Sequence, residues 1–243
     1  MNRIVCLFAL LFISFNTKAQ FSDSVQYHLN IAATGNINRT NDGTAYILNN
    51  GLRFGIRKKS IALNSSSTYV YGQQNKVLTN NDFNTALDFN LYKTFPHFYY
   101  WGLLNYTTNY SLKIVNQLQA GGGVAYNFID KKEAKINLSE GVLYETSDIY
   151  LQDTVRETYH TIRNSLRLQC RFLIKDFISF ETINFWQPSF TYSNDYIVKS
   201  NTTLGVKVKK WLTLTTSLQY NKIARTDREN LLFNYGVIID NYF

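Results

Sequence analysis

Residues 231–243, LLFNYGVIIDNYF, alternate large apolar side chains with smaller or polar ones and end on an aromatic residue. Successive side chains of a β-strand point to opposite faces, so one face of this segment would carry Leu231, Phe233, Tyr235, Val237 and Ile239. The other face would carry Leu232, Asn234, Gly236, Ile238 and Asp240. The segment therefore predicts an amphipathic strand at the end of the chain.

The same period of two recurs along the chain, for example in 83–91, 117–128, 198–208 and 212–221. Each run has about the length that a tilted strand needs to cross a bilayer, or somewhat more. Tyr and Phe together number 35, and this aromatic composition favours strands over helices. We place twelve strands, near 24–37, 45–56, 61–72, 80–94, 98–109, 115–129, 134–147, 157–174, 177–190, 197–208, 211–223 and 229–243.

The first nineteen residues have the pattern of a secretory signal peptide. Arg3 precedes an apolar run over 4–15, and small residues at Thr17 and Ala19 suit cleavage after Ala19. The run is too short for a membrane-spanning helix. We expect a signal peptide at 1–19 and one domain at 20–243, because no linker divides the rest.

Cleavage would change both the charge and the cysteine content. The whole chain has a formal net charge of +8, and the loss of Arg3 and Lys18 would leave +6. Cys6 would be lost as well, so Cys170 would have no intramolecular disulfide partner. The positive charge could suggest a nucleic-acid partner, but an exported protein would not meet nucleic acid. Basic residues in turns and at lipid headgroups of an outer-membrane protein explain the charge better than nucleic-acid binding does.

The connectors between the predicted strands fall into two kinds. Those after the even-numbered strands are tight, at 57–60, 95–97, 130–133, 175–176 and 209–210. Those after the odd-numbered strands are mostly longer and polar, at 38–44, 73–79, 110–114, 148–156, 191–196 and 224–228. Short turns on one side and long loops on the other are typical of outer-membrane barrels, and an even strand count places both termini in the periplasm.

Aromatic residues gather near both ends of the predicted strands, as in the two aromatic girdles of such barrels. Near the tight turns these are Phe98, Tyr99, Tyr100, Trp101, Phe128, Phe177, Trp211 and Phe243, and near the longer loops Tyr69, Tyr71, Tyr106, Tyr144, Trp186 and Tyr220. The alternative is the core of a soluble β-sandwich. A lipid environment leaves no solvent for an unpaired sheet edge, so exported amphipathic strands of this number favour closure.

The sequence thus predicts an all-β fold, a single closed antiparallel transmembrane β-barrel of about twelve strands with periplasmic termini. We expect a monomer in the outer membrane of a Gram-negative bacterium, in contact with outer-membrane lipids. Tyr242 and Phe243 at the end of the last strand resemble the recognition signal of the barrel-assembly machinery, which would then be a partner.

One segment resembles a known family. Residues 118–130, LQAGGGVAYNFID, followed by 138–145, LSEGVLYE, are similar to the glycine-rich hairpin of the YdiY-like salt-induced outer-membrane proteins. Residues 34–40, TGNINRT, resemble the first strand and loop of that family, and the likeness covers most of the chain after residue 19. The resemblance implies an outer-membrane barrel of a domain-of-unknown-function family. It implies no catalytic residues.

The predicted strand 157–174 carries three basic residues on its polar face. Ile162, Leu166, Leu168, Phe172 and Ile174 would face lipid, and Cys170 with them, so the lumen would receive Arg163, Arg167 and Arg171. At ~3.3 Å per residue this ladder spans about 26 Å. We also expect a lumenal position for Lys199, Lys207 and Arg53. Fixed positive charge in a low-dielectric lumen attracts small anionic solutes.

Two interpretations of these charges remain open at this stage. Acidic residues expected in the lumen are Asp88, Glu145, Glu181 and Asp240, and they could pair with the basic residues and plug the barrel as a structural or stress-response protein. The other interpretation is a narrow, anion-leaning pore. Glu140 is anomalous, because strict alternation places its carboxylate in lipid at a cost of several kcal/mol unless a bulge near Gly141 turns it inward.

The signals for an enzyme are weak, and we expect a non-enzyme with no cofactor and no metal. The histidines are His28, His97 and His160. The alternative function is an outer-membrane lipid-modifying enzyme, which would need a histidine near the outer edge of the lipid layer. Only His160 lies near the outer end of a predicted strand, and no serine or acid at a matching position is evident. The glycines at 121–123 lie inside a predicted strand and do not form a nucleotide-binding loop. They would instead let bulky lumenal side chains pack closely.

Overall fold

The computed structural model describes residues 26–40, 43–58, 60–95, 97–151 and 155–242. These residues form an antiparallel sheet and one 3₁₀ turn, η2 (Ala224–Thr226). The described part of the chain contains no helix long and apolar enough to cross a membrane. The strands are β1 (Gln26–Thr40), β2 (Gly43–Lys58), β3 (Ile61–Gln74), β4 (Val77–Phe95), β5 (Phe98–Asn109), β6 (Ile114–Asp130), β7 (Ala134–Leu151), β8 (Val155–Asn164), β9 (Leu166–Ile174), β10 (Ile178–Pro188), β11 (Tyr196–Lys209), β12 (Leu212–Ile223) and β13 (Arg228–Tyr242).

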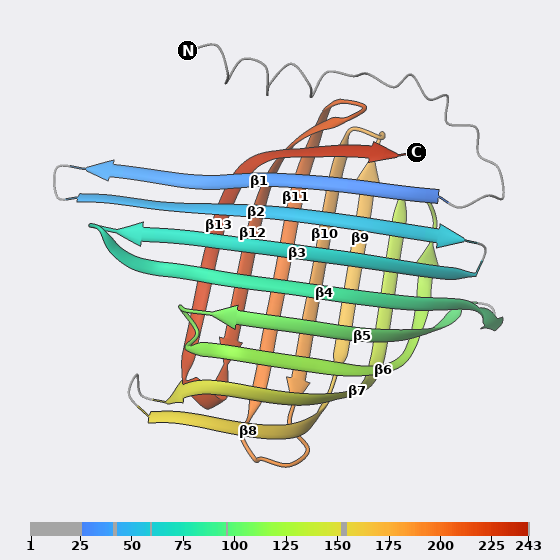
Figure 1. Ribbon diagram of the computed structural model, residues 1–243. Helices are drawn as coiled ribbons and strands as arrows, with labels where there is room; N and C mark the ends of the chain where they lie inside the picture. Colours follow the sequence, from blue (N-terminus) through green and yellow to red (C-terminus); the bar gives the residue numbers. More distant parts are fainter. Residues whose placement is uncertain (1–25, 41–42, 59, 96, 152–154, 243) are drawn as a thin grey trace, which may run out of the picture.

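The sheet closes on itself. Each strand pairs with the next one along the chain, except that β7 pairs with both β8 and β9, and β1 pairs with β13, with Ile31 opposite Ile239. In Figure 1, β1 to β8 run across the front and cross β9 to β13 behind them at a steep angle. Closure excludes the two-sheet sandwich and confirms the antiparallel barrel.

Strands β8 and β9 together occupy one position in the barrel. Val142 of β7 opposes Asn164, and Ser139 opposes Arg167, so the register continues across Ser165 without an extra residue. The barrel therefore has twelve strand positions, as the sequence predicts. The two halves of this strand differ in their other neighbour, because β10 pairs with β9 and ends at Pro188, while β8 continues beyond it.

The apolar members of the alternating segments point outward. Exposed side chains on the outer surface include Phe89, Val124, Leu204, Leu214 and Phe233. Two aromatic residues differ from the predicted girdle, because Tyr99 is buried in the interior and Trp101 lines the lumen. The predicted girdle is wrong at these two positions, since Phe98 and Tyr100 are the outward members of β5.

Five connections at one end of the barrel are short, as predicted, and we call this end the tight-turn end. At the opposite end, which we call the long-loop end, most connections are shorter than predicted. The expected loop at 73–79 is a two-residue turn in which Asn75 and Lys76 have φ of 50° and 66°, and β4 runs for 19 residues. Strands continue here because each residue added to a paired hairpin satisfies its backbone hydrogen bonds in the partner strand.

Glu140 is exposed on the outer surface, and β7 keeps an unbroken register on either side of Gly141. The bulge considered from the sequence is therefore wrong. The carboxylate instead accepts a hydrogen bond from the side-chain amide of Asn164, which lies on the adjacent strand β8. This local partner offsets part of the cost of an outward carboxylate.

Candidate functional site in the barrel lumen

The glycine-rich hairpin makes room for aromatic side chains inside the barrel. Trp101 of β5 reaches across β6 to β7, and a Cβ atom on Gly141 would lie 2.4 Å from its Cζ2. At Gly123 a Cβ would lie 2.1 Å from the carbonyl oxygen of Glu140, so β6 and β7 approach too closely for any larger residue. By contrast, the nearest atom to a Cβ on Gly51 would be at 3.6 Å. The glycines thus serve close packing, in line with the interpretation from the sequence.

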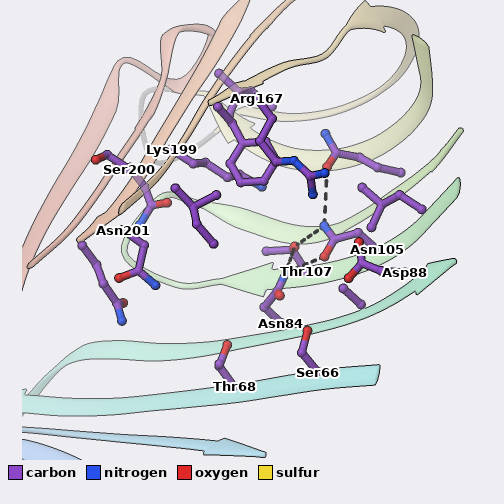
Figure 2. A pocket seen from close by; sticks show the side chains of 18 of the residues that line it. Ser66, Thr68, Asn84, Asp88, Asn105, Thr107, Arg167, Lys199, Ser200 and Asn201 are labelled. Carbon is purple, nitrogen blue, oxygen red and sulfur yellow. Dashed lines mark hydrogen bonds between the residues drawn. The ribbon is translucent and has the colours of Figure 1, made fainter. Parts of the chain in front are cut away.

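The lumen contains a cavity of about 740 Å³, which extends from Arg53 and Arg171 near the tight turns to Asn109 and Asn230 near the longer loops. Figure 2 shows Arg167, Lys199 and Asn201 on one wall, facing Asn84, Asp88, Asn105 and Thr107 on the other. Arg53 and Arg171 line the same cavity and are exposed, so the cavity is accessible to water at the tight-turn end. The volume is in the range of pockets that hold small molecules.

Basic side chains outnumber acidic ones along the described lining. Arg53, Arg167, Arg171 and Lys199 line the cavity, against Asp82, Asp88 and Glu181. Arg167 donates from Nε to Ser139 Oγ at 3.0 Å and from Nη2 to the Tyr99 hydroxyl at 3.4 Å. Among the described residues, none of the four basic groups forms an ion pair with a carboxylate within 4 Å.

The acidic residues of the cavity have their own partners. Asp88 interacts electrostatically with Arg167 and Arg53 without direct contact. Glu181 accepts a hydrogen bond from Gln169 Nε2 at 3.0 Å, and Asp82 accepts from the backbone N–H of Tyr110 at 2.8 Å. The acidic groups therefore reduce the positive potential of the cavity without cancelling it.

A plug of apolar side chains lies in the long-loop half of the lumen. Its members come from the β5–β6 loop and from strands on both sides of the barrel, and all are buried: Leu112, Ile114, Ile149, Tyr159, Ile197 and Ile223. Leu112, Ile114, Ile197 and Ile223 also form the end of the cavity. Across the lumen, Asn230 Nδ2 on β13 donates to Ser111 Oγ at 2.7 Å. These side chains border the cavity and narrow the lumen toward this end.

A buried ionic network lies beside the plug. Arg163, 0% exposed, donates from Nε to Glu145 Oε2 at 2.9 Å and from Nη2 to Asp195 Oδ1 at 2.9 Å. Gln119 and Tyr159 donate to the same Glu145 carboxylate at 2.6 and 2.8 Å. Arg163 is therefore neutralised and fixed, whereas Arg167, four residues away on the same face, borders open space.

Arg225 extends this network from η2. Its guanidinium lies between the rings of Tyr159 and Tyr192, 4.0 and 4.3 Å from their centroids, and pairs with Glu157 at 2.7 Å and Asp195 at 3.3 Å. Burial by itself would lower the pKa of Arg225, but the hydrogen bond and charge of Glu157 raise it above its ordinary value. These contacts cover the edge of β8 beyond the end of β10.

The structure brings together most of the residues singled out from the sequence. Arg53, Asp88, Arg167, Arg171, Glu181 and Lys199 line one cavity, while Arg163 and Glu145 pair in the plug half. Lys207 is exposed near the end of β11. Asp240 of β13 opposes Asn30 of β1. The side chains of Asp240 and Tyr242 lie outside the described part of the structure, as do Phe243 and residues 1–19.

Sequence reasoning missed the partners supplied by connectors. Asp195 and Arg225 lie in segments without periodicity, and no pattern in the sequence places them beside Arg163. Trp101 could have been found, because strict alternation from the outward Tyr100 places it in the lumen. His28 also lines the cavity.

The enzyme alternative gains no support from the geometry. His160 is exposed on β8 opposite Thr146, and the carboxylate of the buried Asp148, the acidic residue next along β7 on that face, is held by Arg156, with Nε to Oδ1 at 2.8 Å. Within the described residues, no group of three or more His, Cys, Asp or Glu side chains could hold a metal ion.

A closed barrel with an apolar outer surface and a polar lumen defines a β-barrel of the outer-membrane class. Solved structures with this fold include the NanC porin, at a TM-score of 0.55 and 8% identity over 88% of this chain and 99% of that one. Another is the COG4313 outer membrane channel from Pseudomonas putida F1, at a TM-score of 0.52 and 11% identity over 95% and 100%. These similarities show the fold alone.

The family is shown by the sequence itself. Residues 31–231 match the model of a family described as protein of unknown function, DUF481, and the chain belongs to that family. A comparison with curated protein sequences gave no match.

Proposed function

We propose that the protein is a narrow, anion-leaning channel of the bacterial outer membrane, closed in this conformation by its apolar plug. The cavity carries the proposal, because Arg53, Arg167, Arg171 and Lys199 line water-accessible space and make no direct ion pair among the described residues. Uncompensated positive charge inside a low-dielectric wall concentrates anions and repels cations. The likeness of the fold to a porin and a channel agrees with this function.

A second candidate is a structural barrel that never opens. The network of Glu145, Arg163, Asp195 and Arg225 favours it, because buried paired charges fix the side chains that fill the lumen. A YdiY-like role in salt or envelope stress would suit either candidate, and a strain that lacks the protein and grows normally at high salt would count against that role.

Reversal potentials in planar bilayers under a KCl gradient test the channel. We expect an anion preference that falls in the variant Arg167→Gln/Lys199→Gln, because both charges face the cavity, and that stays unchanged in Lys207→Gln, whose side chain lies outside it. A cation preference, or an anion preference indifferent to Arg167 and Lys199, would contradict the proposal. Absence of conductance even after the plug is weakened by Ser111→Gly/Leu112→Gly would favour the structural barrel.

We also propose that the tight turns and both termini lie in the periplasm, and that the barrel-assembly machinery recognises the last strand through Tyr242 and Phe243. In a Cys170→Ser background, a membrane-impermeant maleimide added to intact cells should label Asn75→Cys in the β3–β4 turn. It should leave Lys210→Cys, between β11 and β12, unlabelled until the outer membrane is permeabilised. The reverse pattern would refute this orientation.

A further inference from the structure

Trp101 occupies a place in the barrel that the other two tryptophans do not share. Trp186 and Trp211 are 51% and 49% exposed and belong to the outer surface, whereas Trp101 lines the cavity. Its Nε1 donates to the carbonyl oxygen of Val124 at 3.2 Å, and its ring lies against Gly141. The indole is thus held in one position with its N–H already bonded, so what it offers to the cavity is apolar aromatic surface.

Arg167 lines the same cavity as Trp101. One hydrogen-bond partner of Arg167, Ser139, lies on β7 two residues before Gly141, against which the indole packs. The other partner, Tyr99, lies on β5 two residues before Trp101. These bonds fix the guanidinium and leave further N–H groups without an acceptor among the described residues. Figure 2 shows Lys199 entering the cavity from the same wall. Two cationic groups and an aromatic ring therefore line the same cavity.

The remaining lining consists of amide and hydroxyl groups that are already ordered. Asn84 Nδ2 donates to Thr107 Oγ1 at 2.7 Å and to Asn105 Oδ1 at 2.8 Å. On the basic wall, the buried Oδ1 atom of Asn201 has no hydrogen-bond partner among the described residues. A halide ion cannot donate a hydrogen bond to this acceptor, whereas a hydroxyl group of a ligand can.

We propose that this cavity binds a small polyhydroxylated carboxylate, that is, a sugar acid. Arg167 and Lys199 bind the carboxylate, the unpartnered Oδ1 of Asn201 accepts a hydrogen bond from a hydroxyl group, and Trp101 packs against the C–H face of the ligand. The assignment rests on the proposed anion channel, because it names the class of anion that enters. It differs from that proposal in that binding requires only the cavity and no passage through the plug.

Fluorescence of the purified barrel in detergent micelles tests the site. In a Trp186→Phe/Trp211→Phe background, Trp101 is the remaining tryptophan and reports on the cavity. We expect the Trp101 fluorescence to change saturably with glucuronate. The apparent affinity should be at least about tenfold tighter than for glucose, which lacks the charge, or for acetate, which lacks the hydroxyl groups. A tenfold difference corresponds to about 1.4 kcal/mol.

Matched variants separate binding from folding. Arg167→Gln and, independently, Lys199→Gln should each weaken glucuronate binding several-fold, while Lys207→Gln leaves it unchanged. Retained heat-modifiable migration in gels shows that each barrel is folded. Equal responses to glucuronate and acetate, or no saturable response, would overturn the sugar-acid site even if the bilayers show anion conductance. Glucuronate binding without conductance would leave the site intact and remove the channel.

Discussion

Replacing Arg163 by methionine is expected to lower the free energy of unfolding by about 3–5 kcal/mol, the cost of removing one partner from a buried ion pair. The carboxylates of Glu145 and Asp195 would remain buried without their counter-charge. Urea unfolding of the barrel in lipid vesicles, followed by tryptophan fluorescence, measures the loss.

The matched control is Arg156→Met, which removes an exposed arginine from its pair with Asp148 and should have little effect, because exposed pairs contribute little. The triple variant Arg163→Met/Glu145→Gln/Asp195→Asn should recover part of the loss, since it removes the stranded charges. If Arg163→Met is no more harmful than Arg156→Met, the network does not hold the plug half together.

The variant Ser111→Gly/Leu112→Gly is expected to raise the single-channel conductance several-fold. Both residues lie in the β5–β6 loop, so the strand pairing of the barrel stays intact while the plug loses Leu112 and the hydrogen bond from Asn230. Apolar constrictions block ions because water leaves them, and a wider, wetter passage conducts.

Planar-bilayer recordings give the comparison, with Lys76→Gly as the control. Lys76 lies in the β3–β4 turn at the same end of the barrel, and its φ of 66° suits glycine, so this change should leave conductance unaltered. An unchanged conductance in the loop variant would show that the plug of Leu112 and its neighbours does not limit passage.

The architecture could be read from the sequence because lipid imposes a simple rule on every strand. Outward and inward side chains follow a period of two: Phe233, Leu214 and Leu204 point outward, and Asn234, Thr215 and Gly205, the residues next to them, point inward. A shift of one residue would move each apolar side chain inside. The strand count and the tight turns followed from that period. The longer connectors were overestimated, because polar outward residues mark the end of the apolar band and not the end of strand pairing.

The sequence by itself determined a twelve-position barrel and the inward side of residues such as Arg163, Arg167 and Lys199, since alternation is a local property of an extended chain. Only the tertiary structure decided what each inward residue does. Arg163 and Arg167 share one face, yet Arg163 is neutralised by Glu145 and by Asp195 from a loop, while Arg167 borders a cavity beside Trp101. The physical reason is that lumenal partners come from strands and loops distant in the sequence, whose meeting depends on how the barrel closes.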